Sequence, residues 1–168
     1  MPIPENTREI PLTQGQVAIV DAADYEWLSQ YTWSLLRSKH TCYAFRRTTR
    51  AKGAKPICIF MHREILGVDD GSNVDHCDGE GLHNWRANLR QATQSQNMAN
   101  TRLRSDNRHG FKGIERNGDC KKWAARLKAN GTVYYSGGHP TAEDAARIYD
   151  ALASEHCGEF ARLNFPRP

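Results

Sequence analysis

Histidines, carboxylates and amides gather between Val74 and Asn100, and this segment carries the residue types that could do chemistry. Hydrolysis of a phosphodiester near neutral pH needs a base that deprotonates water and a cation that stabilises charge on the phosphate. His76 and a metal bound by the neighbouring Asp75 could supply both. Adjacent residues of a strand normally point in opposite directions, so the two can serve one site only if the strand end is twisted or the phosphate lies across it.

The surrounding residues predict the elements that position these groups. Asp75 and His76 should end one strand, a glycine-containing loop should cover 78–82, and a return strand should cover 87–92. Thr93 and Gln96 have the spacing of a capping box. We therefore expect a helix after the return strand, with Asn97 and Asn100 on one of its sides.

Asp75-His76, Asn88 and Asn97 resemble the ββα-metal motif of HNH endonucleases of the homing and phage type, in the variant whose third motif position is Asn. The resemblance implies that His76 is the general base, that Asp75 and Asn97 bind the metal, and that Asn88 orients the loop and the base. One carboxylate and one amide, completed by water and phosphate, suit Mg²⁺ or Mn²⁺, and no zinc is expected.

Upstream, Met61-His62-Arg63 resembles a short motif that precedes the active hairpin in this family, and Val17 to Trp33 resembles its usual N-terminal extension. The resemblance therefore covers nearly all of 11–104. One departure is His83-Asn84-Trp85, where relatives usually carry Asp-Asn and a basic residue. Supporting roles are assigned to His62, His83, Asn84 and Asn100. Taken singly, each motif residue also has a purely structural interpretation. Asp75 and His76 could stabilise a turn, Asn88 could bind the backbone, Asn97 could lie on a helix surface, and His62 could be a structural histidine.

The last third of the chain predicts a small sheet covered by a helix. Residues 122–128 alternate strictly, Asn130-Gly131 is typical of a tight turn, and 132–136 and 111–116 supply two further strands. Thr141 should cap a helix with an apolar stripe, and Gly158 should end it. Trp123 alternates to the helix side, so we expect it in the core rather than in contact with bases.

Gly113 to Pro166 resembles the DNA-binding domain of the apetala or ethylene-response-factor type. The resemblance rests on Gly113-Ile114, 122–127, 141–146, Tyr149-Asp150 and 163–166. It implies that the sheet enters the major groove, where basic side chains contact phosphates and guanine edges. The residues assigned to DNA contact are Arg90, Arg116, Lys122, Arg126, Lys128 and Tyr135. Glu115 departs from the family, which usually places Arg there.

Composition sets wider bounds. The net charge of +4 and the pI near 8.9 weakly favour a polyanionic partner. The odd number of cysteines, without a C-x-x-C pair, indicates free thiols rather than a disulfide framework. Neither a membrane span nor a secretory signal is evident, which predicts a protein of the phage or bacterial host cytoplasm with no membrane partner.

The sequence thus predicts an α+β chain with three parts. Residues 1–104 form an HNH nuclease domain with a β-rich N-terminal extension and a ββα core at 73–103, residues 105–110 form a linker, and residues 111–168 form the DNA-binding domain as a three-stranded antiparallel sheet packed on one helix. The predicted function is metal-dependent cleavage of double-stranded DNA, of the nicking or homing type, by a monomer. The alternative is a non-catalytic DNA-binding transcriptional regulator, and RNA is a weaker third option.

Overall fold

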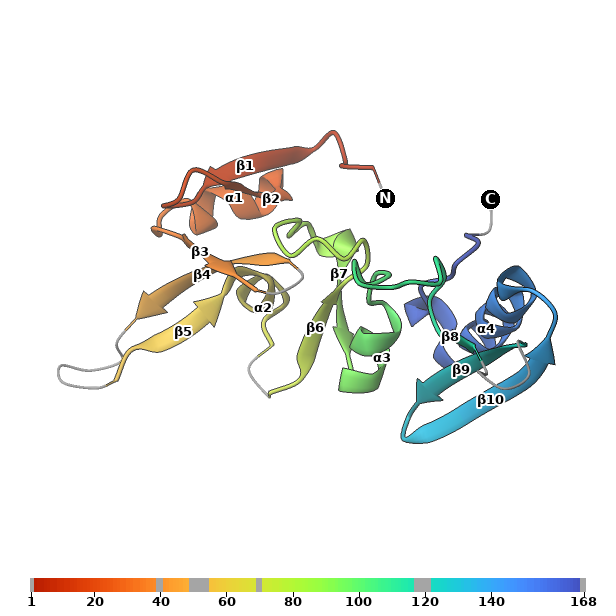
Figure 1. The fold of residues 1–168 in the computed structure, drawn as a ribbon. Coiled ribbons are helices and arrows are strands. Elements are labelled where there is room, and N and C mark those ends of the chain that lie inside the picture. Colours follow the sequence, from red (N-terminus) through yellow and green to blue (C-terminus); the bar gives the residue numbers. More distant parts are fainter. Residues whose placement is uncertain (1, 39–40, 49–54, 69–70, 117–121, 167–168) are drawn as a thin grey trace. The chain divides into compact units, whose positions relative to one another are not determined.

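A computed structural model describes residues 2–38, 41–48, 55–68, 71–116 and 122–166 of the chain. The fold is α+β, with small antiparallel sheets and short helices (Figure 1). It divides into two compact units, Met1–Gln91 and Ala92–Pro168. Among the described helices, none is both long and apolar enough to cross a membrane.

The first unit begins with a hairpin of β1 (Thr7–Pro11) and β2 (Val17–Asp21), followed by α1 (Ala22–Leu28). A three-stranded sheet of β3 (Ser34–Arg37), β4 (Cys42–Thr48) and β5 (Ile57–Phe60) comes next and leads into α2 (Met61–Leu66). One apolar core joins these elements, because Val20, Leu28, Trp33 and Met61 are all buried in it. The unit thus forms a single packed support for the hairpin that follows.

That hairpin consists of β6 (Asn73–His76) and β7 (Leu89–Ala92). The predicted return strand is shorter than expected, because 86–88 form the 3₁₀ turn η1 (Arg86–Asn88), in which the Asn88 N–H donates to the Trp85 carbonyl at 2.9 Å. The loop between the strands is bound to β2 by two backbone bonds, Ile19 N to Leu82 O (2.8 Å) and Asn84 N to Ile19 O (2.6 Å). The core therefore fixes the loop as well as the strands.

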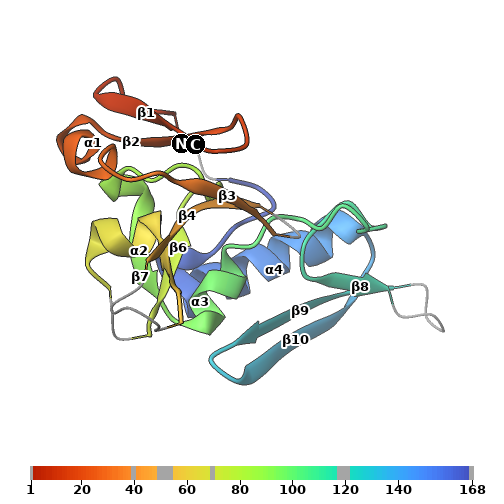
Figure 2. The same cartoon turned by 90° about the vertical axis from the view of Figure 1, so that its left-hand side faces the viewer.

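The second unit contains α3 (Gln94–Ala99), β8 (Ile114–Arg116), β9 (Trp123–Ala129), β10 (Thr132–His139), α4 (Ala142–Cys157) and η2 (Gly158–Phe160). The sheet order is β10-β9-β8, all antiparallel, and α4 lies along one face of it (Figures 1 and 2). The predicted turn at Asn130-Gly131 is confirmed, with φ of 50° and 83°. Trp123 packs with Ile114 and Ala145, which confirms its place on the helix side.

The predicted linker at 105–110 lies inside the second unit, which also includes α3. This helix contacts β9, α4 and η2. In the structure, the sheet-and-helix module and α3 thus form one compact body, while the division into domains at 1–104 and 111–168 stays a prediction. Cys42, Cys58, Cys77 and Cys157 are free thiols, as expected, and Cys120 lies outside the described residues.

Candidate active site

Asp75 and His76 end β6 side by side, and both are buried, with exposed fractions of 3% and 6%. Their side chains engage different partners, as strand alternation requires: Asp75 pairs with Arg90 of β7, and His76 contacts the loop and two aromatic rings. The end of β6 therefore presents a carboxylate and an imidazole from consecutive positions.

His76 lies in a pocket of polar and aromatic side chains. Its Nε2 is 3.2 Å from Oδ1 of Asn84, and its ring meets the His62 ring edge to face at 5.1 Å. An amide oxygen only accepts, so Nε2 carries the proton in this tautomer. Burial lowers the pKa of His76, against the opposing effects of Asn84, Asp78 and Asp75. At neutral pH the imidazole is therefore uncharged, which is the form that can accept a proton.

Asn88 holds the loop of the hairpin. Its Nδ2 donates to Asp78 Oδ1 at 3.0 Å and to the His83 carbonyl at 2.8 Å, and its Oδ1 accepts from the Asp78 N–H at 3.0 Å. The side chain is fully buried. These bonds account for a role of Asn88 in shaping the loop, and a direct part in catalysis stays a prediction.

Each residue of the segment His83-Asn84-Trp85, which departs from the family pattern, makes a defined contact in the structure. His83 Nδ1 lies 2.6 Å from Asp78 Oδ2, Asn84 contacts His76, and Trp85 is fully buried with its ring 5.0 Å from that of His83. Burial alone would raise the pKa of Asp78, but hydrogen bonds from Glu80, His83 and Asn88 outweigh it and lower the pKa. An ionised Asp78 therefore organises the loop around it.

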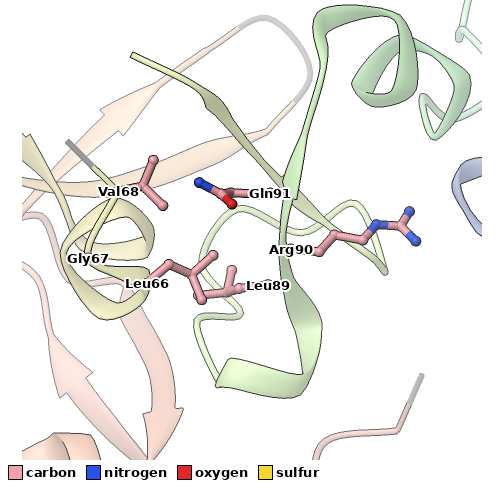
Figure 3. A pocket seen from close by; sticks show the side chains of 6 residues that line it. All are labelled: Leu66, Gly67, Val68, Leu89, Arg90 and Gln91. Carbon is pink, nitrogen blue, oxygen red and sulfur yellow. The ribbon is translucent and has the colours of Figure 1, made fainter. Parts of the chain in front are cut away.

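Arg90 binds Asp75 rather than standing free for DNA. Its Nε and one terminal nitrogen reach Asp75 Oδ2 at 3.0 and 2.8 Å. The stem of Arg90 helps to line a hollow of about 260 Å³ with Leu66, Val68 and Gln91, and its guanidinium points away from these three side chains (Figure 3). The predicted DNA contact of Arg90 stays a prediction, and in this structure its guanidinium is engaged by a carboxylate.

His62 is the second residue of α2. It stacks on Phe60 at 5.5 Å, and its Nδ1 has no hydrogen-bond partner among the described residues. Burial is the main cause that lowers the pKa of His62 to about 3, and electrostatic interaction with His76 and Arg63 lowers it further. Its neighbour Arg63 donates to the carbonyls of Ser72 and Val68, so the short motif also anchors the chain that leads into β6.

Tyr43 of β4 is a site residue that sequence reasoning missed. Its ring lies 5.5 Å from His62 and 6.1 Å from His76, so it covers both imidazoles. Gly81 of the loop approaches it closely, because a Cβ there would come within 2.7 Å of the ring and 2.3 Å of the Cys42 carbonyl oxygen. Nothing near Tyr43 in the sequence marks it, and its contacts depend on the packing of β4 against the hairpin loop.

Asn97 and Asn100 belong to α3 in the second unit, where Asn97 is half-buried and Asn100 is the buried C-cap. The capping box of Thr93 and Gln96 is confirmed, with bonds of 3.2 and 2.7 Å. No cluster of three or more His, Cys, Asp or Glu side chains in the described ranges could hold a metal ion. The predicted ligands, the carboxylate of Asp75 and the amide of Asn97, are oxygen donors of the type that suits a hard divalent ion, and their joint binding of one ion stays a prediction.

The face of the second unit's sheet that α4 does not cover is basic and exposed. Tyr135 pairs with Arg126 and Val133 with Lys128, so these side chains share one face, and Tyr135 is 57% exposed. Lys122 is exposed just before β9, and Glu115 lies 3.8 Å from Arg126. Arg116 differs from this group, because it pairs with Trp123 and its guanidinium lies 5.6 Å above that ring.

The chain is similar to two curated proteins, while no family model and no solved structure matches it. An uncharacterised HNH endonuclease of Acanthamoeba polyphaga mimivirus is 31% identical over 153 residues, a match that covers 90% of this chain and 76% of that protein. Dehydration-responsive element-binding protein 2A of Arabidopsis thaliana is 39% identical over 64 residues, which are 37% of this chain and only 19% of the plant protein. The long viral match, which covers most of both proteins, shows that the chain belongs to the HNH endonuclease family.

Proposed function

We propose that the chain is a metal-dependent DNA endonuclease in which His76 activates the attacking water. The observation that carries the proposal is the pair at the end of β6: a buried, neutral imidazole next to a buried carboxylate. His76 takes a proton from water, the new bond to phosphorus forms, and the bond to the leaving sugar oxygen breaks. A divalent ion, when bound, would stabilise the charge on the phosphate and on that oxygen.

Asp75 is the proposed ligand of this ion, with Asn97 as the ligand predicted from the sequence. Mg²⁺ and Mn²⁺ suit such oxygen donors. Asn84, bound to His76, and Asn88, which shapes the loop, are proposed to keep the imidazole in place. The histidine and the carboxylate would then act on one phosphate from neighbouring positions of a single strand.

Double-stranded DNA is the proposed substrate, and the exposed face of β9 and β10 is the proposed docking surface. Support comes from Arg126, Lys128 and Tyr135, which share that face, and from the partial likeness to a plant protein whose name says that it binds a dehydration-responsive element. A cationic face gains affinity by releasing counterions from DNA. Nicking is the expected mode, because the chain has one HNH motif.

Supercoiled plasmid incubated with the full chain tests the proposal. In Mg²⁺ or Mn²⁺ we expect open circles to form before linear DNA, and EDTA should stop the reaction because the ion is part of the chemistry. A plasmid that stays supercoiled with each ion, while the chain still binds it, would refute the proposed nuclease.

That second result would favour a non-catalytic DNA-binding regulator built on the same fold. The ion pair between Asp75 and Arg90 favours this regulator, because a guanidinium bound to a carboxylate competes with a metal cation for the same oxygens. An Arg90→Gln variant separates the two functions. If Arg90 only orients Asp75 in a nuclease, the metal requirement persists; in a regulator, the variant remains inactive with every ion.

A further inference from the structure

The helix α3 is too short to be stable by itself. It has six residues, and isolated helices in water are marginal even at about twice that length. Its capping box fixes only its first turn. Because α3 carries Asn97, the residue predicted to bind metal, what holds this helix in place bears directly on the proposed reaction.

Lys112 holds the C-terminal end of α3. Its ammonium donates to the carbonyl oxygen of Ala99, the last residue of the helix, and to that of Thr101 at 2.8 Å. The Arg162 N–H also donates to the Ala99 carbonyl, at 3.2 Å. The last carbonyls of a helix lack partners within it and carry the negative end of its dipole, so a cation placed there is favourable.

Lys112 is itself fixed by the end of the chain. Asn164 accepts from the Lys112 N–H at 2.7 Å and donates to its carbonyl at 3.1 Å, and Asn164 is bound in turn to Asp150 of α4 at 2.8 Å. Burial, together with Arg162, lowers the pKa of Lys112 to about 8. The ammonium is thus still charged at neutral pH, and the two carbonyl oxygens compensate for part of the water it has lost.

The other end of α3 is bound by the β9–β10 hairpin. Asn130, in the turn of that hairpin, donates its N–H to Ser95 Oγ at 2.8 Å. The turn has a positive φ at Asn130, which fixes where this N–H points. The same two strands carry Arg126, Lys128 and Tyr135, the proposed DNA contacts. Both ends of α3 are therefore attached to the module that is proposed to bind DNA.

We propose that Lys112 is a positioning residue for DNA hydrolysis: it fixes α3 on the C-terminal module, so that this module supports the cleavage step as well as locating the target. The inference rests on the proposed nuclease function. It differs from the linker predicted at 105–110, which would leave the two modules independent. The hydrogen bonds of Lys112, Asn130 and Arg162 instead hold α3 and the residues that follow it within the second unit.

The test uses full-length Lys112→Met, Lys112→Arg and, as a control that removes one charge from the same segment, Arg108→Met. The quantities measured are the single-turnover cleavage rate at saturating DNA and Mn²⁺, the Kd for DNA in EDTA, and hydrogen exchange of the amides of α3 in EDTA. For Lys112→Met we expect cleavage about tenfold slower and α3 exchange about tenfold faster, because the carbonyl oxygens of Ala99 and Thr101 lose a charged donor, with the Kd unchanged within about twofold. Lys112→Arg should restore most of the rate, and Arg108→Met should behave like wild type.

A Lys112→Met protein with the wild-type cleavage rate, with unchanged α3 exchange, or with a weakened Kd as its only defect would overturn the inference. If Lys112→Met accelerates exchange throughout the second unit, Ser95→Ala decides: a slower cleavage rate with faster α3 exchange supports the inference, and wild-type values refute it. If the wild-type chain does not cleave DNA at all, the proposed function fails, and α3 exchange alone still decides whether Lys112 fixes the helix.

Discussion

Two buried histidines, His62 and His76, meet edge to face in the first unit, with the Tyr43 ring beside both. Burial lowers the pKa of each, so both rings are neutral at pH 7. A neutral His76 serves the proposed base chemistry. The aromatic surroundings that keep it neutral also lower the stability of the fold at acid pH. The buried histidines resist protonation in the folded protein, whereas the unfolded chain accepts these protons freely.

The His62→Phe variant tests this cost. The folded pKa of His62 is about 3 and the ordinary value is 6.5, so its contribution to stability is fully present above pH 6.5 and is lost as the pH falls toward 3. The loss at the acid end has an upper bound of about 5 kcal/mol. We expect His62→Phe to flatten the fall in the free energy of unfolding between about pH 7 and pH 4.5, measured with urea.

His109→Phe is the matched control, since His109 is exposed. Its stability should fall with pH in parallel with that of the wild type. The interpretation of His62 is wrong if His62→Phe also follows the wild-type curve.

Among the elements, those with a clear local signal were predicted well. Strict alternation predicted β9, and the Asn-Gly turn predicted the start of β10. Thr141 predicted the start of α4, and the capping box of Thr93 and Gln96 predicted the start of α3. β1 and α2 lack such a signal and were not predicted. β1 shows no alternation and ends in a proline, and the six-residue α2 follows Phe60, an N-cap residue whose side chain makes no capping hydrogen bond.

The same contrast holds for the candidate site. Asp75, His76 and Asn88 lie close together in the sequence, and their spacing identified the hairpin. Tyr43 reaches His76 only through the packing of separate elements, so no local pattern marks it. The pairing of Asp75 with Arg90 depends on the register of β6 and β7, which spacing alone does not determine.

The close contact between Gly113, just before β8, and Tyr149 of α4 leads to a testable prediction. Gly113 has φ of +70°, and a Cβ there would lie 1.9 Å from the Tyr149 ring. Gly131 has a similar φ of +83° but nothing within 4 Å. Gly113→Ala should therefore destabilise the second unit by about 3 kcal/mol or more, and Gly131→Ala by only about 1 kcal/mol.

Hydrogen exchange of the β9 amides at increasing urea measures both effects within the second unit. Equal losses in the two variants would mean that the ring of Tyr149 moves aside without cost and that its packing does not require glycine at position 113.

On the scale of the whole molecule, charge is divided between the two faces of the second unit. Arg126 and Lys128 occupy the uncovered face of the sheet, whereas Glu143 and Asp144 lie in the first turn of α4. A cationic face opposite an acidic helix favours one orientation toward a polyanion. The net charge of +4 would not by itself have indicated where DNA binds.

Arg126→Gln tests this orientation. If the guanidinium contacts a phosphate, the slope of log Kd against log salt should fall by about 1, because one fewer counterion is released, and the affinity should drop by roughly fivefold. Arg147→Gln, an exposed position of α4, is the matched control and should keep the wild-type slope. Fluorescence anisotropy across a salt series measures both, and equal slopes in all three proteins would argue against the sheet face.

The role of His76 is tested most directly by measuring DNA binding and DNA cleavage on one preparation of His76→Ala, with His109→Ala as control. Loss of a general base costs about a hundredfold or more in rate. We expect His76→Ala to bind DNA in EDTA like wild type and to lose at least that factor in nicking with Mn²⁺, while His109→Ala retains both activities. A His76→Ala protein that nicks plasmid at the wild-type rate would contradict the assignment of His76 as the base.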